Sequence, residues 1–290
     1  MTVDRVVGVD FSAAARSAGD NTWLAVCRRT DAGLDVTELA TAAELLDTDG
    51  SRAETLPALV DFLAEPPVPT AVGLDVPFAL PAEFLGFDGD DERRADSGGL
   101  WTAFVADTPD QWGVLGPLDG PEELYERVRE TADTRGFPRT RATDETYGGQ
   151  EPAGYRIRTQ TFYGISAVLA PLVDRGARVP PVHPDPDADL TLLETYPAAV
   201  FDALPDATRE GYKSDSRAGV AARGRNRAAL QAAGVSLDDT AADCLTATDD
   251  ALDAVAAAYA AANDHAAAVE REYTPRERVE AVIFDGTTEN

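Results

Sequence analysis

Carboxylates stand at the ends of two apolar segments, and two more share one face of a predicted helix. Asp10 follows VVGV and Asp75 follows AVGL, whereas Asp250 and Asp253 lie three residues apart in DDALDAVAAAYAA. Glu194 lies within another apolar segment, LTLLETY. A buried carboxylate is costly unless a cation or strong hydrogen bonds compensate its charge. Converging carboxylates suit Mg²⁺ or Mn²⁺, and two such ions about 3.5–4 Å apart can promote phosphodiester hydrolysis.

Each of these carboxylates also has a purely structural interpretation. Asp10 and Asp75 can bond to the turns that follow them, and Glu194 can face solvent from its strand. Asp250 can be a first-turn acid that interacts with the helix dipole. Asp253 lies deeper in the predicted helix, so capping explains it less well.

The elements that must position these residues follow from hydrophobic periodicity. Strands are predicted over 5–11, 22–28, 34–39, 70–74, 190–196 and 281–284, and helices over 51–64, 122–134, 160–176, 198–204, 226–233 and 249–262. The chain therefore begins β-β-β-α-β, and a right-handed crossover makes the fourth strand parallel to the first. Asp10 and Asp75 are then expected at the same edge of the sheet, where ligands of such sheets bind.

Residues 82–155 interrupt this pattern. They are rich in Asp, Gly and Pro, and the segment FLGFDGDDERRADSGG is the loosest part. We interpret 82–155 as an insertion or lid within a single domain that spans 1–290.

The charge of the chain is strongly negative. It holds 52 acidic and 25 basic residues, for a net charge of −27, and Lys213 is the only lysine. This composition indicates adaptation to high salt, where screening removes the self-repulsion that opposes folding. No stretch of about 18 apolar residues is present, and the N-terminus is interpreted as a strand and not as a signal peptide. We therefore expect a cytoplasmic protein that does not bind membranes.

The stretch 209–227, REGYKSDSRAGVAARGRNR, reverses this charge locally. It holds six basic residues against two acids. A second basic set lies at 139–158. The basic residues of both sets are Arg209, Lys213, Arg217, Arg223, Arg225 and Arg227, and Arg139, Arg141, Arg156 and Arg158. They can bind phosphates by bidentate contacts, or they can pair with acids of the chain itself.

Six segments in order resemble the DUF429 family. They are GVDFSAA, GLDVPFALP, RTQTFYGI, LLETYPAAVF, YKSDSRAG and DDALDAVAAAYAA, and YTPRERVEAVIF looks like the family's final segment. The resemblance implies a ribonuclease H-like fold and membership of a group of predicted nucleases. It also implies that Asp10 and Asp75 occupy the strand-end acidic positions and that Glu194 belongs to an E-x-Y-P element. Asp250 and Asp253 look like the D-x-x-D-A helix of resolvase-type members of the superfamily.

We therefore expect an α/β fold with a ribonuclease H-like mixed five-stranded sheet in the order 3-2-1-4-5, flanked by helices, with a large insertion between strands 4 and 5. The first functional hypothesis is Mg²⁺- or Mn²⁺-dependent phosphodiester hydrolysis of nucleic acid. The expected catalytic residues are Asp10, Asp75, Glu194, Asp250 and Asp253. Four of these, Asp10, Asp75, Asp250 and Asp253, are also expected to bind the metal. The residues expected to contact substrate are Ser12, Arg158, Lys213 and Arg217. The alternatives are a nucleotide-dependent phosphotransferase of actin-like type, which lacks support from a second glycine-rich phosphate turn, and a non-catalytic binding module.

Overall fold

The computed structural model describes residues 3–87, 99–108 and 110–287. The chain divides into two compact units, the first formed by 1–75, 189–267 and 284–290, and the second by 76–188 and 268–283. The predicted insertion, 82–155, lies in the second unit. Most of FLGFDGDDERRADSGG falls outside the described residues.

The first unit contains the strands that carry the candidate carboxylates. Its elements are β1 (Arg5–Asp10), α1 (Ala18–Asn21), β2 (Trp23–Thr30), β3 (Gly33–Thr41), α2 (Ala42–Leu46), α3 (Arg52–Ala64), β4 (Thr70–Asp75), β5 (Leu190–Thr195), α10 (Pro197–Ala203), α11 (Arg217–Ala232), β6 (Val235–Ser236), α12 (Asp239–Ala247) and α13 (Asp249–Glu270). The last strand is β7 (Ile283–Phe284).

The sheet is mixed, as predicted, but it has seven strands in the order β6-β3-β2-β1-β4-β5-β7. β2 runs antiparallel to β1 and to β3, whereas β4 runs parallel to β1 and to β5. The prediction of five strands is therefore wrong, because the two-residue strands β6 and β7 extend the sheet at its two edges. β7 lies within the strand predicted over 281–284, which the predicted five-stranded order left out. β6 was not predicted, because two residues are too few to show a strand periodicity in the sequence.

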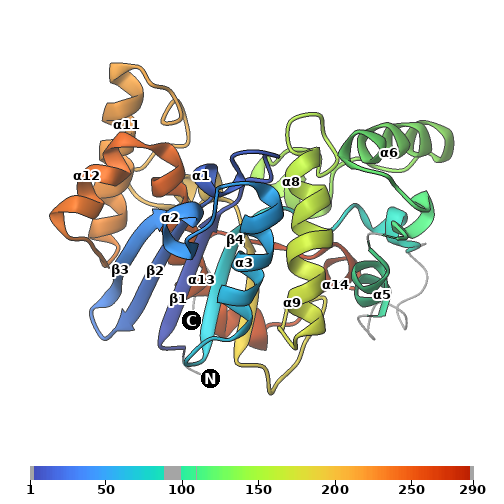
Figure 1. Cartoon of the computed structure of the whole chain (residues 1–290), viewed down its shortest axis with the longest axis horizontal. Helices are drawn as coiled ribbons and strands as arrows, with labels where there is room; N and C mark the ends of the chain where they lie inside the picture. The colour runs from blue at the N-terminus through green and yellow to red at the C-terminus, as the bar shows by residue number, and fades with distance from the viewer. Residues whose placement is uncertain (1–2, 88–98, 109, 288–290) are drawn as a thin grey trace. The chain divides into compact units, whose positions relative to one another are not determined.

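Helices flank the sheet of the first unit. Figure 1 shows α3 in front of the strands and α13, coloured red, behind them. α3 begins where the Ser51 hydroxyl accepts a hydrogen bond from the Glu54 amide, and it buries Leu56, Leu59 and Leu63 at helical spacing. α13 is rich in alanine and almost wholly buried up to Ala262, so it can pack closely against the strands.

Helix α11 is longer than predicted. It begins at Arg217, nine residues before the predicted start, because the hydroxyl of Ser216 caps it by accepting a hydrogen bond from the Gly219 amide. This first turn requires glycine at position 219, because a Cβ added to Gly219 would lie 1.9 Å from the Ser214 carbonyl oxygen. The basic stretch therefore forms a loop followed by a helix.

The second unit is mainly helical. Its elements are η1 (Ala82–Leu85), α5 (Gly99–Asp107), η2 (Gly113–Leu115), α6 (Pro121–Arg135), α7 (Ala142–Tyr147), α8 (Arg158–Tyr163), the π-helical η3 (Gly164–Leu169), α9 (Ala170–Asp174) and α14 (Glu277–Glu280). The single helix predicted over 160–176 is thus interrupted by a π-helical segment. Pro171, just beyond that segment, cannot donate to the preceding turn and clashes with a regular α-helical carbonyl.

Buried charges join distant segments of the second unit. The carboxylate of Glu280 accepts hydrogen bonds from the amides of Ala82 and Ala142, both at 3.0 Å, and from Arg276 at 2.6 Å. Arg141 is fully buried and pairs with Asp144 at 2.7 Å. Of the two interpretations left open for Arg141, pairing with an acid of the chain itself is confirmed, and its enclosed guanidinium does not fit phosphate binding. Among the described residues, no helix combines the length and apolar character needed to cross a membrane.

Candidate metal centre

Two strand ends bring Asp10 and Asp75 together, as the sequence predicted. β1 and β4 are parallel neighbours, and Asp10 is the direct register partner of Asp75. The residues before them are buried valine, leucine, alanine and glycine that hold both strands in the core. Parallel strands present their carboxyl ends at one sheet edge, so the two carboxylates share that edge.

Glycines allow α13 to bring a third carboxylate to the same place. Gly8 and Gly73 are register partners one row of side chains inside the sheet. A Cβ on Gly8 would lie 1.9 Å from the Ala254 carbonyl oxygen, and a Cβ on Gly73 would lie 2.2 Å from that of Ala257. The helix backbone therefore lies directly on the two strands, and Asp253 is fully buried there.

The three carboxylates form one cluster. Asp10, Asp75 and Asp253 each offer an oxygen, and these oxygens all lie within 4.8 Å of one another. Oδ1 of Asp253 is buried and has no hydrogen-bond partner among the residues that the structure describes. A buried unpartnered carboxylate oxygen needs a compensating charge, and hard divalent cations prefer oxygen ligands. These three residues could therefore hold a metal ion.

Burial and mutual repulsion raise the pKa values of the three clustered carboxyl groups. Desolvation raises the pKa of Asp10 well above its usual range, and the charges of Asp253 and Asp75 raise it further. Desolvation raises the pKa of Asp75 to about 7, with Asp253 and Glu194 adding to the effect against the opposing charge of Lys213. Desolvation also raises the pKa of Asp253 to about 6, although Lys213 opposes it.

Lys213 and Tyr212 both reach Asp253. Nζ of Lys213 lies 2.7 Å from Oδ2 of Asp253, and the Tyr212 hydroxyl donates to the same oxygen at 3.3 Å. Desolvation lowers the pKa of Lys213, but Asp253, Asp75 and Asp10 more than compensate and raise it, so the ammonium stays charged. Sequence reasoning expected Lys213 to contact substrate and overlooked Tyr212, although Tyr212 belongs to the same YKSDS segment.

Arg223 holds the loop that carries Lys213. Its Nη1 donates to the carbonyl oxygens of Tyr212 and Ser214, at 2.7 and 3.1 Å, and its Nε and Nη2 donate to those of Thr246 and Ala247, at 2.9 and 3.2 Å. Its side chain is buried. Phosphate binding, one of the two interpretations left open for Arg223, does not fit, because all three nitrogens donate to backbone carbonyls inside the fold.

Asp250 and Glu194 lie outside the group of three. Asp250 is half-buried in the first turn of α13. Desolvation, followed by the charge of Asp249, raises its pKa. Glu194 is buried on β5 as the register partner of Leu74, which precedes Asp75. The solvent-facing interpretation of Glu194 is therefore wrong, and its charge acts on Asp75.

The remaining predicted substrate residues occupy different places. The Ser12 hydroxyl accepts from the Ala14 amide at 3.4 Å in the turn after β1. Arg217 is exposed at the start of α11. Arg158 belongs to the second unit, where its guanidinium lies 4.3 Å from the Tyr155 ring centre and pairs with Glu122. Their contacts with a substrate stay predictions.

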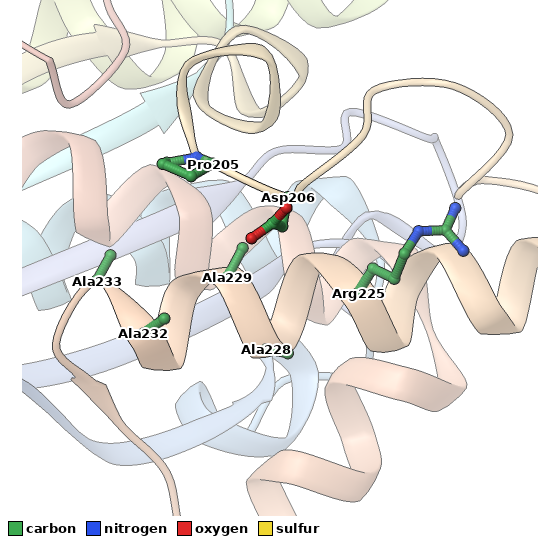
Figure 2. A pocket seen from close by; sticks show the side chains of 7 residues that line it. All are labelled: Pro205, Asp206, Arg225, Ala228, Ala229, Ala232 and Ala233. Atoms are coloured by element: carbon green, nitrogen blue, oxygen red, sulfur yellow. The ribbon is translucent and has the colours of Figure 1, made fainter.

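A pocket in the first unit lies beside the C-terminal half of α11, at and beyond the end of the basic stretch 209–227. Its volume is about 360 Å³, and it is lined by Pro205, Asp206, Arg225, Ala228, Ala229, Ala232 and Ala233. Figure 2 shows the alanine methyls of α11 along one side of this pocket, with Asp206 and Arg225 near them. No member of the carboxylate cluster lines it, and alanine methyls supply no catalytic group.

Comparison with known proteins places this arrangement in a family. No curated protein and no solved structure matches the chain significantly. The family model described as "Protein of unknown function (DUF429)" matches residues 8–278. That match spans nearly the whole chain and includes all three carboxylates, so the chain belongs to the DUF429 family.

Proposed function

We propose that this protein is an Mg²⁺- or Mn²⁺-dependent phosphodiesterase that acts on nucleic acid, on a ribonuclease H-like fold. One observation carries the proposal: three carboxylate oxygens from two parallel strand ends and a helix lie within 4.8 Å of one another. The unpartnered Oδ1 of the buried Asp253 supports it, because that oxygen is suited to a cation.

The chain's own residues have separate roles in this proposal. Asp10, Asp75 and Asp253 would hold the cation, and Asp250 and Glu194 would orient water or add to the negative field. A bound divalent cation supplies Lewis-acid polarisation of a phosphoryl oxygen and activation of water. Arg217 would bind backbone phosphates, with Ser12 as a further substrate contact.

The mixed sheet supports the ribonuclease H-like part of the proposal. Three antiparallel strands lead through α3 to the parallel strand β4, and the carboxylates stand at the ends of β1 and β4. The high negative charge is consistent with function at high salt, where the Debye length falls to about 3 Å at 1 M and the net charge repels nucleic acid little.

Cleavage assays test the proposal. Branched DNA, RNA–DNA hybrid and single-stranded substrates would be incubated with the protein in high salt, with Mg²⁺, with Mn²⁺ and with EDTA. We expect cleavage of at least one substrate that requires the metal and is lost in Asp10→Asn. Wild-type protein that cleaves no better than Asp10→Asn across this panel would contradict the proposal.

A further inference from the structure

Lys213 is the cation that the structure already places on the carboxylate cluster. Its Nζ lies 2.7 Å from Oδ2 of Asp253, whose side chain is 0% exposed, whereas the lysine side chain is 57% exposed. The two oxygens of Asp253 therefore differ. Oδ2 receives Lys213 and Tyr212, and Oδ1 is buried with no partner among the described residues.

The position of Lys213 is fixed from both sides. Nη1 of Arg223 binds the carbonyl oxygens of Tyr212 and Ser214, the residues on either side of Lys213. The Tyr212 ring is buried and packs edge-on against Phe201, with 5.1 Å between the ring centres. Arg223 also binds the carbonyl oxygens of Thr246 and Ala247, just before α13 begins at Asp249. The loop with Lys213 and the helix with Asp253 are thus held by one guanidinium.

The residue type at this position is also unusual for the chain. Lys213 is the only lysine among 25 basic residues. Arginine presents a planar fork of donors, whereas lysine presents a compact and strongly hydrated point charge. A compact charge beside one carboxylate oxygen resembles a metal ion more closely than a guanidinium does.

We propose that Lys213 is a resident cation of this site, so that the cluster binds one divalent ion and not two. The inference rests on the metal site of the proposed function. Oδ1 of Asp253, with Asp10 and Asp75, is left for the divalent ion, while Oδ2 keeps the ammonium. One divalent ion and one ammonium together balance the charge of the three carboxylates, which lowers the cost of burying them.

Mn²⁺ titration in high salt tests this inference through binding stoichiometry, without any measurement of activity. The variants are Lys213→Met, which keeps the aliphatic stem and removes the charge, and Lys213→Arg, which keeps the charge. Asp10→Asn serves as the background for weak sites on the acidic surface. Circular dichroism with and without Mn²⁺ checks that each variant is folded.

We expect one Mn²⁺ per wild-type chain and per Lys213→Arg chain, and two per Lys213→Met chain, above the Asp10→Asn background. Should Lys213→Met not fold without metal, Lys213→Gln, which keeps a polar donor, takes its place with the same expectation. Two ions in wild type, or one ion in wild type and in both neutral variants, would overturn the inference and leave the proposed nuclease standing. No Mn²⁺ on wild type would overturn both.

Discussion

Gly8 and Gly73 face each other across β1 and β4, and the backbone of α13 lies directly on both of them. This contact places Asp253 beside the carboxylates that end the same two strands. The geometry of the site therefore depends on two glycines, which have no side chain and cannot themselves bind a ligand.

Adding a methyl group at either glycine should push α13 away from the sheet. We expect Gly8→Ala and Gly73→Ala to lower the free energy of unfolding by about 3 kcal/mol, at the upper end of the cost of overpacking a core, because the atoms nearest to an added Cβ are backbone atoms of the helix. Denaturant unfolding measures this. Gly224→Ala is the matched control, since an added Cβ there meets nothing within 4 Å and helix propensity favours alanine by about 1 kcal/mol. Equal effects at all three glycines would contradict the close contact.

The crowded acids should make the metal-free protein less stable as the pH rises. The folded-state pKa values of Asp75 and Asp253 are raised to about 7 and about 6, whereas unfolded aspartate titrates near about 4. The folded state thus binds more protons across this window, and its stability falls as the pH increases from about 4 to about 7. Each unit by which a folded-state pKa exceeds the unfolded-state pKa corresponds to about 1.4 kcal/mol of this loss in the free energy of unfolding.

Subtraction isolates this effect from other titrating groups. The free energy of unfolding of wild type minus that of Asp10→Asn, measured in EDTA, should decrease between pH 4.5 and 7.5. Mn²⁺ should reverse the trend, because a bound cation favours the ionised carboxylates. If this difference in the free energy of unfolding does not change with pH, the clustered carboxylates do not raise one another's pKa values.

Neutralising one member of the cluster should have opposite effects with and without metal. In EDTA at pH 8, Asp10→Asn should raise Tm by a few degrees, because it removes one of three crowded charges. With Mn²⁺, the same variant should lose the rise in Tm that wild type shows. Asp243→Asn, an exposed residue of α12, is the control and should leave both quantities unchanged. A lower Tm for Asp10→Asn in EDTA would indicate a structural role for this carboxylate.

Arg223 should matter for stability far more than the arginine two residues later. Arg223→Gln leaves backbone carbonyls of the loop with Lys213 and of the last turn of α12 without their donors, so we expect a loss of about 3 kcal/mol or more. Arg225 is exposed on the same helix, and Arg225→Gln should change stability by less than about 0.5 kcal/mol. Urea unfolding of the two variants distinguishes a structural arginine from a surface one. Similar losses, or none, would refute this account of Arg223.

The net charge of −27 should make folding depend on salt. Self-repulsion destabilises the compact state at low ionic strength, and the Debye length falls from about 10 Å at 0.1 M to about 3 Å at 1 M. We expect Tm, measured with EDTA present, to rise steadily between 0.1 and 2 M KCl. A Tm that does not change over this range would contradict the proposed adaptation to high salt.

Part of the site could be predicted from sequence because it depends on local patterns. Asp10 and Asp75 end short apolar strands, and a β-β-β-α-β order leaves few arrangements other than parallel neighbours. Asp253 could be predicted from its place in a helix of small residues. The contact of Lys213 with Asp253 could not, because 40 positions separate them and hydrogen bonds of Arg223 to backbone carbonyls place the loop.

The errors have physical causes as well. A buried arginine that bonds within the fold and an arginine on the surface look alike in a sequence, so the sequence could not decide between phosphate binding and intramolecular bonding for Arg141 and Arg223. β6 is two residues long and depends on pairing with β3, so it has no pattern of its own. The π-helical segment before Pro171 has the same spacing of apolar residues as a regular helix.

Anomalous diffraction at the manganese absorption edge, from a crystal soaked in Mn²⁺, shows whether the three carboxylates hold a metal ion. We expect one anomalous peak that contacts an oxygen of Asp10, an oxygen of Asp75 and Oδ1 of Asp253, with Lys213 still on Oδ2. The same crystal form of Asp10→Asn should lack the peak. An empty cluster in wild type, with manganese only on surface acids, would show that Asp10, Asp75 and Asp253 do not form a metal site.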